Sequence, residues 1–553
     1  MTRIQELIEN GKMDDLWQTC CGYIDLNMDE FMDIQRRLLL EQIELLKKSK
    51  LGQKIFNGAL PTSVEEFRQQ IPLSTYKDYC PELLERQEDT LPAKVNQWTH
   101  TSGKSGEYPF KWIPTTDKTW EEMVKLMCAA AIFASCRKKR EIRPLPTKFL
   151  YATATAPYTT GVVAHKLEEE FGYQFFPSLH ELEEMTFLER LEEGIRTALS
   201  EGIDGIYGMT NVLVAIGERI KNGGGNMSIT DFLSQPKVLV RLTRAFIKSK
   251  LAGRSILPKD LWNIKAMVCG GTDSRIFRHK IKDMWGVQAL DLFASTEALV
   301  VAMQTWDYES MTFVPSMVFM EFIPESEYFK WKEDDSYEMN TVLLDEVKAG
   351  EIYELVITNY YGGALARYRT GDMIKIDSLR NEKLDIDIPQ MSFNRRADDL
   401  IDLGLMRLTE TVIWKALENT DIPYIDWTAR KEIFDEKPVL RLFLELTNSG
   451  SIEAFDLEVE LYEQLKKLND GFVHNDISSM EILMNLHPVK ITFLPTGAFT
   501  NYAALRQAEG ADLAQLKPPH INPSEQILSL LEVGIDTVSL VKTKSEYVSL
   551  SDQ

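Results

Sequence analysis

The chain has 553 residues, which is too many for one typical hydrophobic core, so two or more domains are expected. Apolar residues make up 44% of the sequence and charged residues 26%, as in an ordinary globular protein. The formal net charge of −22 argues against nucleic acid or an anionic membrane as the main partner.

The six cysteines and seven histidines show neither a metal-ligand spacing nor a disulfide framework. Residues 1–15 are polar and helical in pattern, without the apolar core of a signal peptide. No window approaches the run of about twenty apolar residues that a membrane span requires. We therefore expect a reduced, cytoplasmic enzyme without a structural metal.

Helical patterns dominate the first hundred residues, and the strongest covers Phe31–Ser49. A second strong helix is predicted over Thr119–Lys139, with Asp117 or Thr119 as its N-cap. A third helix is predicted over Thr230–Leu251, within a region that also contains buried strands.

Two buried strands are predicted at Lys148–Ala156 and Ile264–Gly271, and each ends in small residues. Two more, at Ser316–Pro324 and Glu351–Asn359, are separated by an acidic loop over Trp331–Asn340. This mixture of helices with strands that end in glycine favours an α/β sheet whose ligands lie at the strand ends.

The pattern changes from about Arg396, where a strand, a helix and a second strand are typical of a small α+β domain. The predicted fold class is therefore α/β. A large N-terminal domain over residues 1–395 has β-sheets flanked by helices, and a small, mobile C-terminal α+β domain covers residues 396–553.

The first candidate motif is the loop in "WTHTSGKSGEYPFKW", between Trp98 and Trp112. Its small residues would let backbone N–H groups approach an anion, and its hydroxyl and ammonium groups could complete a phosphate site. An ordinary polar hairpin is the alternative. The residues concerned are Ser102, Gly103, Lys104, Ser105 and Gly106.

Two further motifs follow strands. Gly270, Gly271 and Thr272 would let a flat ligand lie close to the backbone, although a tight strand-to-helix turn fits equally well. In "LFASTEALV" a strand ends at Ser295-Thr296-Glu297, where a carboxylate could hold Mg²⁺; the alternative is a helix cap.

In "ARYRTGDMIKI" two arginines and a tyrosine precede a predicted turn at Thr370-Gly371-Asp372, after which a new strand begins. An aspartate in a fixed turn can accept both hydroxyls of a ribose, but an exposed β-turn has a similar composition. The stretch "FNRRADDL" then combines arginines and aspartates at the domain boundary, which suits a hinge or any linker.

Taken in this order, these five motifs resemble those of the adenylate-forming superfamily, which includes acyl-CoA synthetases, luciferases and peptide-synthetase adenylation domains. The chain is more closely similar to the Gretchen Hagen type of acyl-acid amido synthetase, whose plant members conjugate hormones to amino acids. "FASTE", "FMEFIPESE", "KAGEIYELVITN" and "TGAFTNYAALRQAEGADLAQLKPPHI" follow that family's phrasing. The resemblance covers about Ile34 to His520.

The resemblance implies ATP and Mg²⁺ as cofactors. Ser102 and Ser105 would grip the β- and γ-phosphates, and Lys104, where the family usually has Thr or Ser, would add a point charge or turn outward. Glu297 would bind Mg²⁺. The implied nucleotide-binding residues are Ser102, Gly103, Lys104, Ser105, Gly106, Gly270, Gly271, Thr272, Phe293, Ser295, Thr296, Asp372 and Arg396.

Within this set, Phe293 would stack on adenine where the family more often has Tyr, and Asp372, assisted by Arg396, would hold the ribose. Lys517 in "QLKPPH" matches the family's C-terminal lysine, which favours adenylation; a surface lysine is the alternative. Asp398 would lie at the hinge of a rotating C-terminal domain. The implied catalytic residues are Lys517, Glu297, Ser102 and Ser105.

Candidates for the acyl-acid pocket are Tyr151 and Thr153 in "YATATAPYTTG" and Tyr207 and Met209 in "GIYGMTN". Both stretches mix small and aromatic residues, which suits an apolar acyl group, but they could equally be core packing.

The implied reaction joins a carboxylic acid to AMP, releases pyrophosphate, and transfers the acyl group to an amine such as an amino acid. The alternatives are a coenzyme A ligase with the same first step, a non-catalytic nucleotide-binding protein, and transfer to a carrier-protein thiol. No carrier domain is recognised in the chain. The expected partners are small molecules, with no nucleic acid and no membrane.

Overall fold

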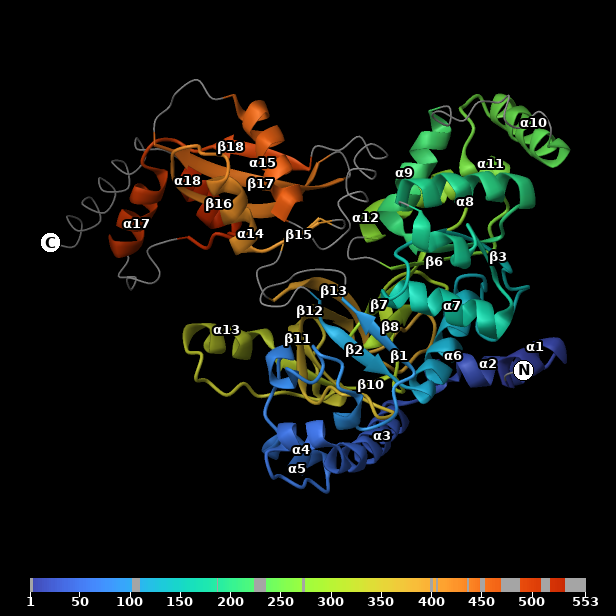
Figure 1. Ribbon diagram of the computed structural model, residues 1–553, viewed down its shortest axis with the longest axis horizontal. Helices are drawn as coiled ribbons and strands as arrows, with labels where there is room; N and C mark the ends of the chain where they lie inside the picture. Colours follow the sequence, from blue (N-terminus) through green and yellow to red (C-terminus); the bar gives the residue numbers. More distant parts are fainter. Residues whose placement is uncertain are drawn as a thin grey trace. The chain divides into compact units, whose positions relative to one another are not determined.

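The chain forms two compact units, the first comprising Met1–Ser102 with Phe110–Ala397 and the second including Asp398–Gln553. The sequence predicts a boundary between residues 395 and 396. Each unit is described by itself. The computed structural model (Figure 1) describes residues 3–101, 110–185, 187–222, 235–270, 274–397, 401–403, 406–434, 437–447, 453–468, 488–508 and 518–532.

The first unit begins with helices, as the sequence predicts. The longest, α3, starts at a capping box in which Asn27 and Glu30 each bond the other's backbone N–H at 3.0 Å. Its apolar face, which includes Phe31 and Leu39, is buried. The helices are α1 (Arg3–Glu9), α2 (Met13–Cys20), α3 (Met28–Lys48), α4 (Lys50–Phe56) and α5 (Val64–Gln70).

An eleven-stranded sheet, in the order β10-β11-β12-β13-β9-β8-β7-β6-β5-β3-β4, organises the rest of this unit. Strands β7, β6, β5, β3 and β4 run parallel, and the strands from β7 to β10 pair antiparallel. The parallel strands are β3 (Lys148–Ala152), β4 (Gln174–Phe176), β5 (Gly205–Met209), β6 (Ala266–Gly270) and β7 (Leu290–Ser295).

The antiparallel part carries the segments that include the last two sequence motifs. Its strands are nearly all buried, which explains their almost continuous apolar sequence. They are β8 (Leu299–Gln304), β9 (Met311–Phe313), β10 (Val318–Pro324), β11 (Ile352–Asn359), β12 (Tyr368–Ser378) and β13 (Gln390–Arg396).

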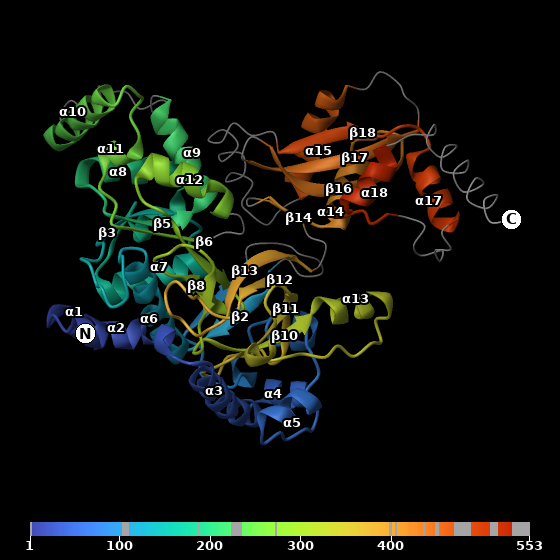
Figure 2. The same cartoon turned by 180° about the vertical axis from the view of Figure 1, so that it is seen from behind.

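Helices that precede or connect the parallel strands surround that half of the sheet (Figures 1 and 2). Helix α9 begins directly after the last residue of β5. The helices are α6 (Asp117–Phe133), α7 (Thr159–Phe171), α8 (Phe187–Glu201), α9 (Thr210–Lys221), α10 (Pro236–Leu251), α11 (Pro258–Leu261) and α12 (Ser274–Trp285).

Three local expectations change. The N-cap of α6 is Thr116, whose hydroxyl accepts a hydrogen bond from the Thr119 N–H, so neither Asp117 nor Thr119 is the cap. The acidic loop predicted from Trp331 is helical at its start, because α13 extends over Glu325–Glu333. Helix α10 has a proline at its first position and begins at Pro236.

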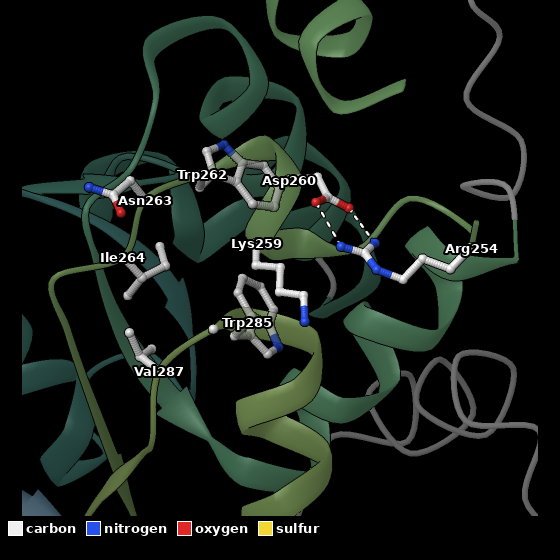
Figure 3. Close-up of a pocket in the computed structure, with 9 residues that line it drawn as sticks. Arg254, Lys259, Asp260, Trp262, Asn263, Ile264, Trp285 and Val287 are labelled. Atoms are coloured by element: carbon white, nitrogen blue, oxygen red, sulfur yellow. Dashed lines mark hydrogen bonds and ion pairs between the residues drawn. The ribbon is translucent and has the colours of Figure 1, made fainter. Parts of the chain in front are cut away.

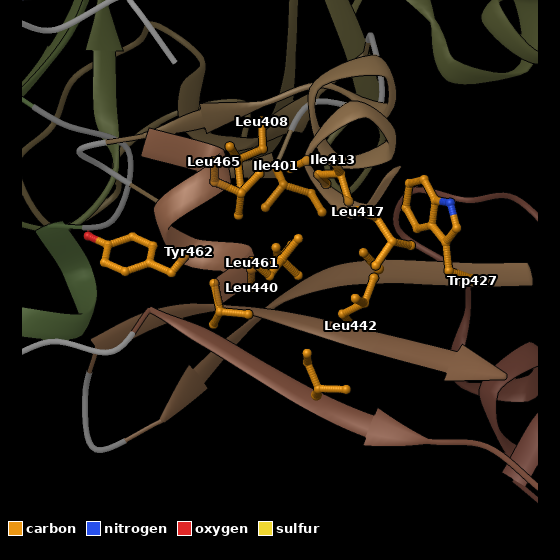
Figure 4. Packing of buried hydrophobic residues seen from close by; sticks show 14 of the residues in the cluster. Ile401, Leu408, Ile413, Leu417, Trp427, Leu440, Leu442, Leu461, Tyr462 and Leu465 are labelled. Carbon is orange, nitrogen blue, oxygen red and sulfur yellow. The ribbon is translucent and has the colours of Figure 1, made fainter. Parts of the chain in front are cut away.

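The second unit is the small α+β domain that the sequence predicts. Strands β16 (Tyr424–Phe434) and β17 (Lys437–Leu446) form an antiparallel hairpin, and β18 (Val489–Phe493) joins β17 in parallel. Leu440, Leu442, Leu461 and Trp427 belong to its buried core (Figure 4). The other elements are β14 (Ile401–Asp402), β15 (Arg407–Leu408), α14 (Glu410–Glu418), α15 (Ala454–Leu468), α17 (Ala498–Ala508) and α18 (Glu525–Glu532).

His520 packs against this core, with its ring stacked 4.5 Å from that of Trp427. Its two ring nitrogens lie 2.9 Å from an Asp426 oxygen and 2.7 Å from a Glu410 oxygen. The Asp426 carboxylate raises the pKa of His520, burial opposes that rise, and Glu410 adds to it.

The elements of the two units together confirm the predicted α/β class with a smaller α+β domain.

Candidate functional site

The carboxyl ends of neighbouring parallel strands bring several predicted residues to one edge of the sheet. Met209 at the end of β5 pairs with Gly270 at the end of β6, and Gly270 pairs with Leu292 on β7. Gly270 is exposed, and a Cβ added there would meet no atom of the described residues within 4 Å. Ligands of α/β sheets bind at this kind of edge, so open space beside Gly270 suits a bound molecule.

The acyl-pocket candidates divide into buried and accessible residues. Tyr151 is 2% exposed and its hydroxyl donates to the Ala154 carbonyl, and Thr153 is 4% exposed. Tyr207 and Met209 are only half-buried. The Tyr151 and Tyr207 rings are 6.4 Å apart. Tyr151 and Thr153 are therefore packed in the core, and among these four candidates the accessible surface belongs to Tyr207 and Met209.

The Ser295-Thr296-Glu297 segment is a turn between β7 and β8. The Ser295 hydroxyl accepts a hydrogen bond from the Ala298 N–H at 3.1 Å, which closes the turn. A helix cap is therefore the wrong reading of this segment, because the chain returns directly into β8. Within the described chain, the Glu297 carboxylate makes no hydrogen bond or ion pair, whereas its backbone carbonyl accepts a bond from Asn359 at 2.8 Å.

Thr296 ties this turn to the hairpin that carries the predicted phosphate loop. Its hydroxyl donates to the His100 carbonyl at 3.4 Å and accepts from the Thr159 hydroxyl at 3.1 Å. His100 is the last residue of β1 (Gln97–His100), which pairs with β2 (Trp112–Thr115). The end of the hairpin from which the loop departs is thus fixed beside the Glu297 turn.

An aromatic cluster holds the same strand end. The His100 ring lies 4.5 Å from Phe110, 4.8 Å from Trp112 and 4.5 Å from Tyr158, measured between ring centroids. Burial lowers the pKa of His100, so the ring is favoured in its neutral form. A neutral, packed imidazole is a structural support for the hairpin.

Asp372 and Arg396 form a nearly buried ion pair between β12 and β13. One Arg396 nitrogen lies 2.6 Å from Asp372 Oδ1, and the two side chains are 17% and 11% exposed, respectively. The predicted turn at Thr370–Asp372 is wrong, because these residues lie inside continuous strand β12. Gly371, with φ of +71°, supplies the local irregularity that the sequence suggested as a turn.

Phe293 is half-buried on β7, with its ring centroid 6.0 Å from that of Phe393 on β13. The two rings are inclined by 32°, so Phe393 lies behind one side of Phe293 and limits its rotation. A half-exposed aromatic ring close to the strand edge has a surface on which a flat heterocycle could lie.

Two residues given no role from the sequence join this group. Lys111 donates a hydrogen bond from Nζ to the Tyr368 hydroxyl at 3.2 Å. Burial raises the pKa of Tyr368, the Glu297 carboxylate adds to the rise, and Arg396 opposes it. Lys111 is the lysine of "PFKW", which closely follows the predicted phosphate loop. This position next to the loop is the sequence feature that could have identified Lys111 as a candidate.

Several predicted residues lie outside the described part of the chain, so their positions stay predictions. They are Ser102, Gly103, Lys104, Ser105, Gly106, Gly271, Thr272, Asp398 and Lys517.

Elsewhere in the first unit, a cavity of about 340 Å³ lies between α11 and the end of α12 (Figure 3). None of its lining residues is among the predicted site residues. Arg254 and Asp260 on its wall form an ion pair of 2.6 Å, so their charges offset each other. This cavity is distinct from the strand edge that carries Gly270 and Met209.

Comparison with known proteins identifies two domains in the chain. The GH3 family N-terminal domain matches residues 22–171, and the GH3 family central domain matches residues 311–396. The resemblance to the Gretchen Hagen family is thereby confirmed over these two stretches, which together cover less than half of the chain. The second match ends at Arg396, so it includes Asp372 and its ion-pair partner.

Similar curated proteins include indole-3-acetic acid-amido synthetase GH3.4 of Arabidopsis thaliana, 26% identical over 40% of this chain and 37% of that protein. Jasmonoyl--L-amino acid synthetase GH3.5 of Oryza sativa subsp. japonica is 26% identical over 40% of this chain and 38% of its own length. The matches thus span less than two fifths of these relatives. The solved AtGH3.15 acyl acid amido synthetase in complex with 2,4-DB is 17% identical, covers 93% of this chain and 95% of that chain, and has a TM-score of 0.49.

Proposed function

We propose that this chain is an AMP-forming ligase: it activates a carboxylic acid with ATP as an acyl-adenylate and transfers the acyl group to an amine, forming an amide. The observation that carries the proposal is the buried Asp372–Arg396 pair at the end of the GH3 central domain. Glu297 and Lys111 lie around the same tyrosine, Tyr368, which supports one shared site.

The chemistry explains why such a site needs charged groups. A carboxylate is a poor acylating agent because oxide is a poor leaving group, whereas the mixed anhydride with AMP releases a stable phosphate ester. The enzyme must bring two anions together, and preorganised cations can supply several kcal/mol to that step. Lys111, held by Tyr368, would offer one positive charge beside the phosphate loop, and Lys517 would offer a second.

The nucleoside would be held by the sheet. Asp372 would accept hydrogen bonds from the ribose hydroxyls, and Arg396 would hold its carboxylate in one orientation. Phe293 would stack on the adenine ring, with the backbone at Gly270 along its edge. Ser102 and Ser105 in the connecting loop would bind the β- and γ-phosphates.

Mg²⁺ fits the donor chemistry of this site. Among the described residues no group of three or more His, Cys, Asp or Glu side chains could hold a metal ion by itself. Magnesium does not require such a group, because it is usually bound through one or two carboxylates together with phosphate oxygens and water. Glu297 would supply the carboxylate, and bound Mg²⁺ would offset the negative charge of the phosphates.

The substrates follow from the proposed chemistry and from the relatives. The half-exposed Tyr207 and Met209 would line an apolar acyl pocket, which suits aryl, indolyl or fatty acids. The name of one relative, jasmonoyl--L-amino acid synthetase GH3.5, includes an amino acid, so an amino acid is the proposed amine. All six cysteines are free thiols, which supports a reducing, cytoplasmic location. No helix in the described ranges is long and apolar enough to cross a membrane.

The test is to identify the products by mass. The protein is incubated with ATP, Mg²⁺, the amino acids, coenzyme A and a panel of aryl, indolyl and fatty acids. An N-acyl amino acid formed together with AMP is the expected result. Acyl-coenzyme A as the product would instead assign the chain to the coenzyme A ligases. ATP-dependent thermal stabilisation without any acid-dependent product would assign it to non-catalytic nucleotide binding.

A further inference from the structure

Helix α10 exposes four large apolar side chains. The exposed fraction is 63% for Val240, 53% for Phe246, 53% for Ile247 and 84% for Leu251. Val240, Ile247 and Leu251 are separated by seven and four residues, so they form one stripe along the helix, about 16 Å long at 1.5 Å per residue. Large apolar side chains exposed along one face of a helix are a feature of interaction sites on folded domains.

The opposite face of α10 fixes the helix to the domain. Val238, Ala245 and Ser249 are buried. Arg241 donates hydrogen bonds to the carbonyls of Ala198 and Leu199 on α8, the first at 3.1 Å. Figures 1 and 2 both place α10 beside α11 at the margin of the first unit. The apolar stripe therefore faces outward because the fold holds the helix in that rotation.

Cations flank the stripe on both sides. Helix α10 contains five Lys and Arg residues and no Asp or Glu. By helical geometry, Arg244 and Lys248 fall on one side of the stripe and Lys250 on the other. Lys and Arg can lay their aliphatic stems along an apolar surface and extend their charges outward. Arg254, beyond the helix end, is paired with Asp260 and adds no charge to this face (Figure 3).

We propose that α10 docks the protein on an anionic phospholipid surface. The helix would lie in the plane of the interface, with Val240, Ile247 and Leu251 among the upper acyl chains and the flanking cations at the headgroup phosphates. A basic helix with one apolar stripe is the pattern that binds membrane surfaces in this way. Charge complementarity argues for lipid phosphates, because they can meet cations on both sides of the stripe at once.

The acidic character of the whole chain does not prevent this docking. The net charge is −22, and it led us to expect no membrane partner. Charges more than about 8 Å away are largely screened at physiological ionic strength, however, so the local sign of the surface decides short-range attraction. Helix α10 itself carries five cations and no carboxylate, and the described carboxylates that interact with its cations from neighbouring elements are Glu201, with Arg241, and Asp260, with Lys248, so positive charge is in excess there. The proposal is independent of the enzymatic function, because α10 carries none of the residues assigned to it.

The experiment is co-sedimentation of the full chain with vesicles of phosphatidylcholine, either alone or containing phosphatidylserine. We expect binding only to the phosphatidylserine vesicles, weakened by added salt. The charge variant Arg244→Glu/Lys248→Glu is expected to bind the phosphatidylserine vesicles at least about tenfold more weakly than the parent. The matched control is Lys94→Glu/Lys383→Glu, which reverses the same number of charges at exposed lysines outside α10 and is expected to bind like the parent.

The apolar variant Ile247→Ser/Leu251→Ser tests the stripe itself, and both positions are exposed, so the fold should be kept; an unchanged thermal transition checks this. Loss of binding in this variant supports insertion. The proposal is overturned if the parent does not bind, if it binds both vesicle types equally, or if the charge variant binds like the parent. Sedimentation velocity without lipid tests the alternative that the α10 face binds a second copy of the chain. A dimer of the parent that becomes a monomer in the apolar variant would support this alternative and overturn the proposal.

Discussion

The substitution Asp372→Asn should weaken both nucleotide binding and fold stability, and a matched variant separates the two effects. The Asp372 carboxylate lies 2.6 Å from Arg396, with 11% and 17% of the two side chains exposed. Asparagine keeps the shape and one acceptor oxygen but removes the charge. We propose that the same carboxylate also accepts hydrogen bonds from the two ribose hydroxyls of ATP. The substitution should therefore weaken both the ion pair between β12 and β13 and the binding of ATP.

The magnitudes of the two effects differ. A hydrogen bond between charged groups contributes about 1.5–3 kcal/mol, so the loss of the charge should lower the free energy of unfolding by about 2 kcal/mol. Two weakened ribose bonds should together cost about 1.5–3 kcal/mol of binding, which is roughly ten- to hundredfold in the Kd for ATP.

The chain offers a matched control on the same strand. Arg369 on β12 pairs with Glu354 on β11 at 2.8 Å, with 13% and 1% of the side chains exposed. Its guanidinium lies 4.2 Å from the ring centroid of Trp331. Glu354→Gln should therefore lower stability at least as much as Asp372→Asn does, but it should leave ATP affinity unchanged. Urea unfolding gives the first quantity and titration calorimetry with ATP gives the second.

Two results would refute this reasoning. An unchanged Kd for ATP in Asp372→Asn would show that the carboxylate does not hold the ribose. An equal loss of affinity in both variants would show that β12 affects nucleotide binding only through general stability.

Three further outcomes are expected. Lys111→Met should slow acid-dependent pyrophosphate release about tenfold or more, whereas Lys111→Arg keeps the charge and most of the rate; equal rates in all three proteins would remove Lys111 from the reaction. Glu297→Gln should raise the Mg²⁺ concentration for half-maximal pyrophosphate release roughly tenfold, and an unchanged Mg²⁺ titration would exclude it as a ligand. Asp426 is the main cause of the raised folded-state pKa of His520. Protonated His520 therefore stabilises the fold fully at pH values below its unfolded-state pKa near 6.5, and this stabilisation is lost as pH rises through the folded-state pKa. Urea unfolding measured at a series of pH values should show this decline, and His520→Gln should abolish it.

The sequence predicts the fold class and the segments that carry the site, because strong apolar periodicity and strand-ending glycines are local features. Strand β6 lies within its predicted span, and helix α3 begins at Met28, three residues before its predicted start at Phe31. Local detail is less predictable: the α6 cap falls on Thr116, one residue before the nearer candidate, because several neighbouring residues are equally good caps. Gly371 reads as part of a turn because a strand irregularity and a turn use the same residue types.

The contacts that assemble the site are not local and could not be predicted. Thr296 donates to the carbonyl of His100, 196 residues earlier in the chain. Lys111 reaches Tyr368 across 257 residues. Such bonds depend on the order of strands in the sheet, which periodicity does not specify. The ion pair of Asp372 with Arg396 is an intermediate case: the motif indicated both residues, and only the register of β12 with β13 brings them together.

The central claim is that the chain forms an acyl-adenylate, and acid-dependent exchange of labelled pyrophosphate into ATP tests it most directly. Exchange reports the reversible first step alone, so it needs neither the amine nor knowledge of the final product. The account predicts that label enters ATP only when an accepted carboxylic acid is present, and that Glu297→Gln sharply reduces the rate. Release of ADP and phosphate that depends on the acid, with no exchange of pyrophosphate, would contradict it.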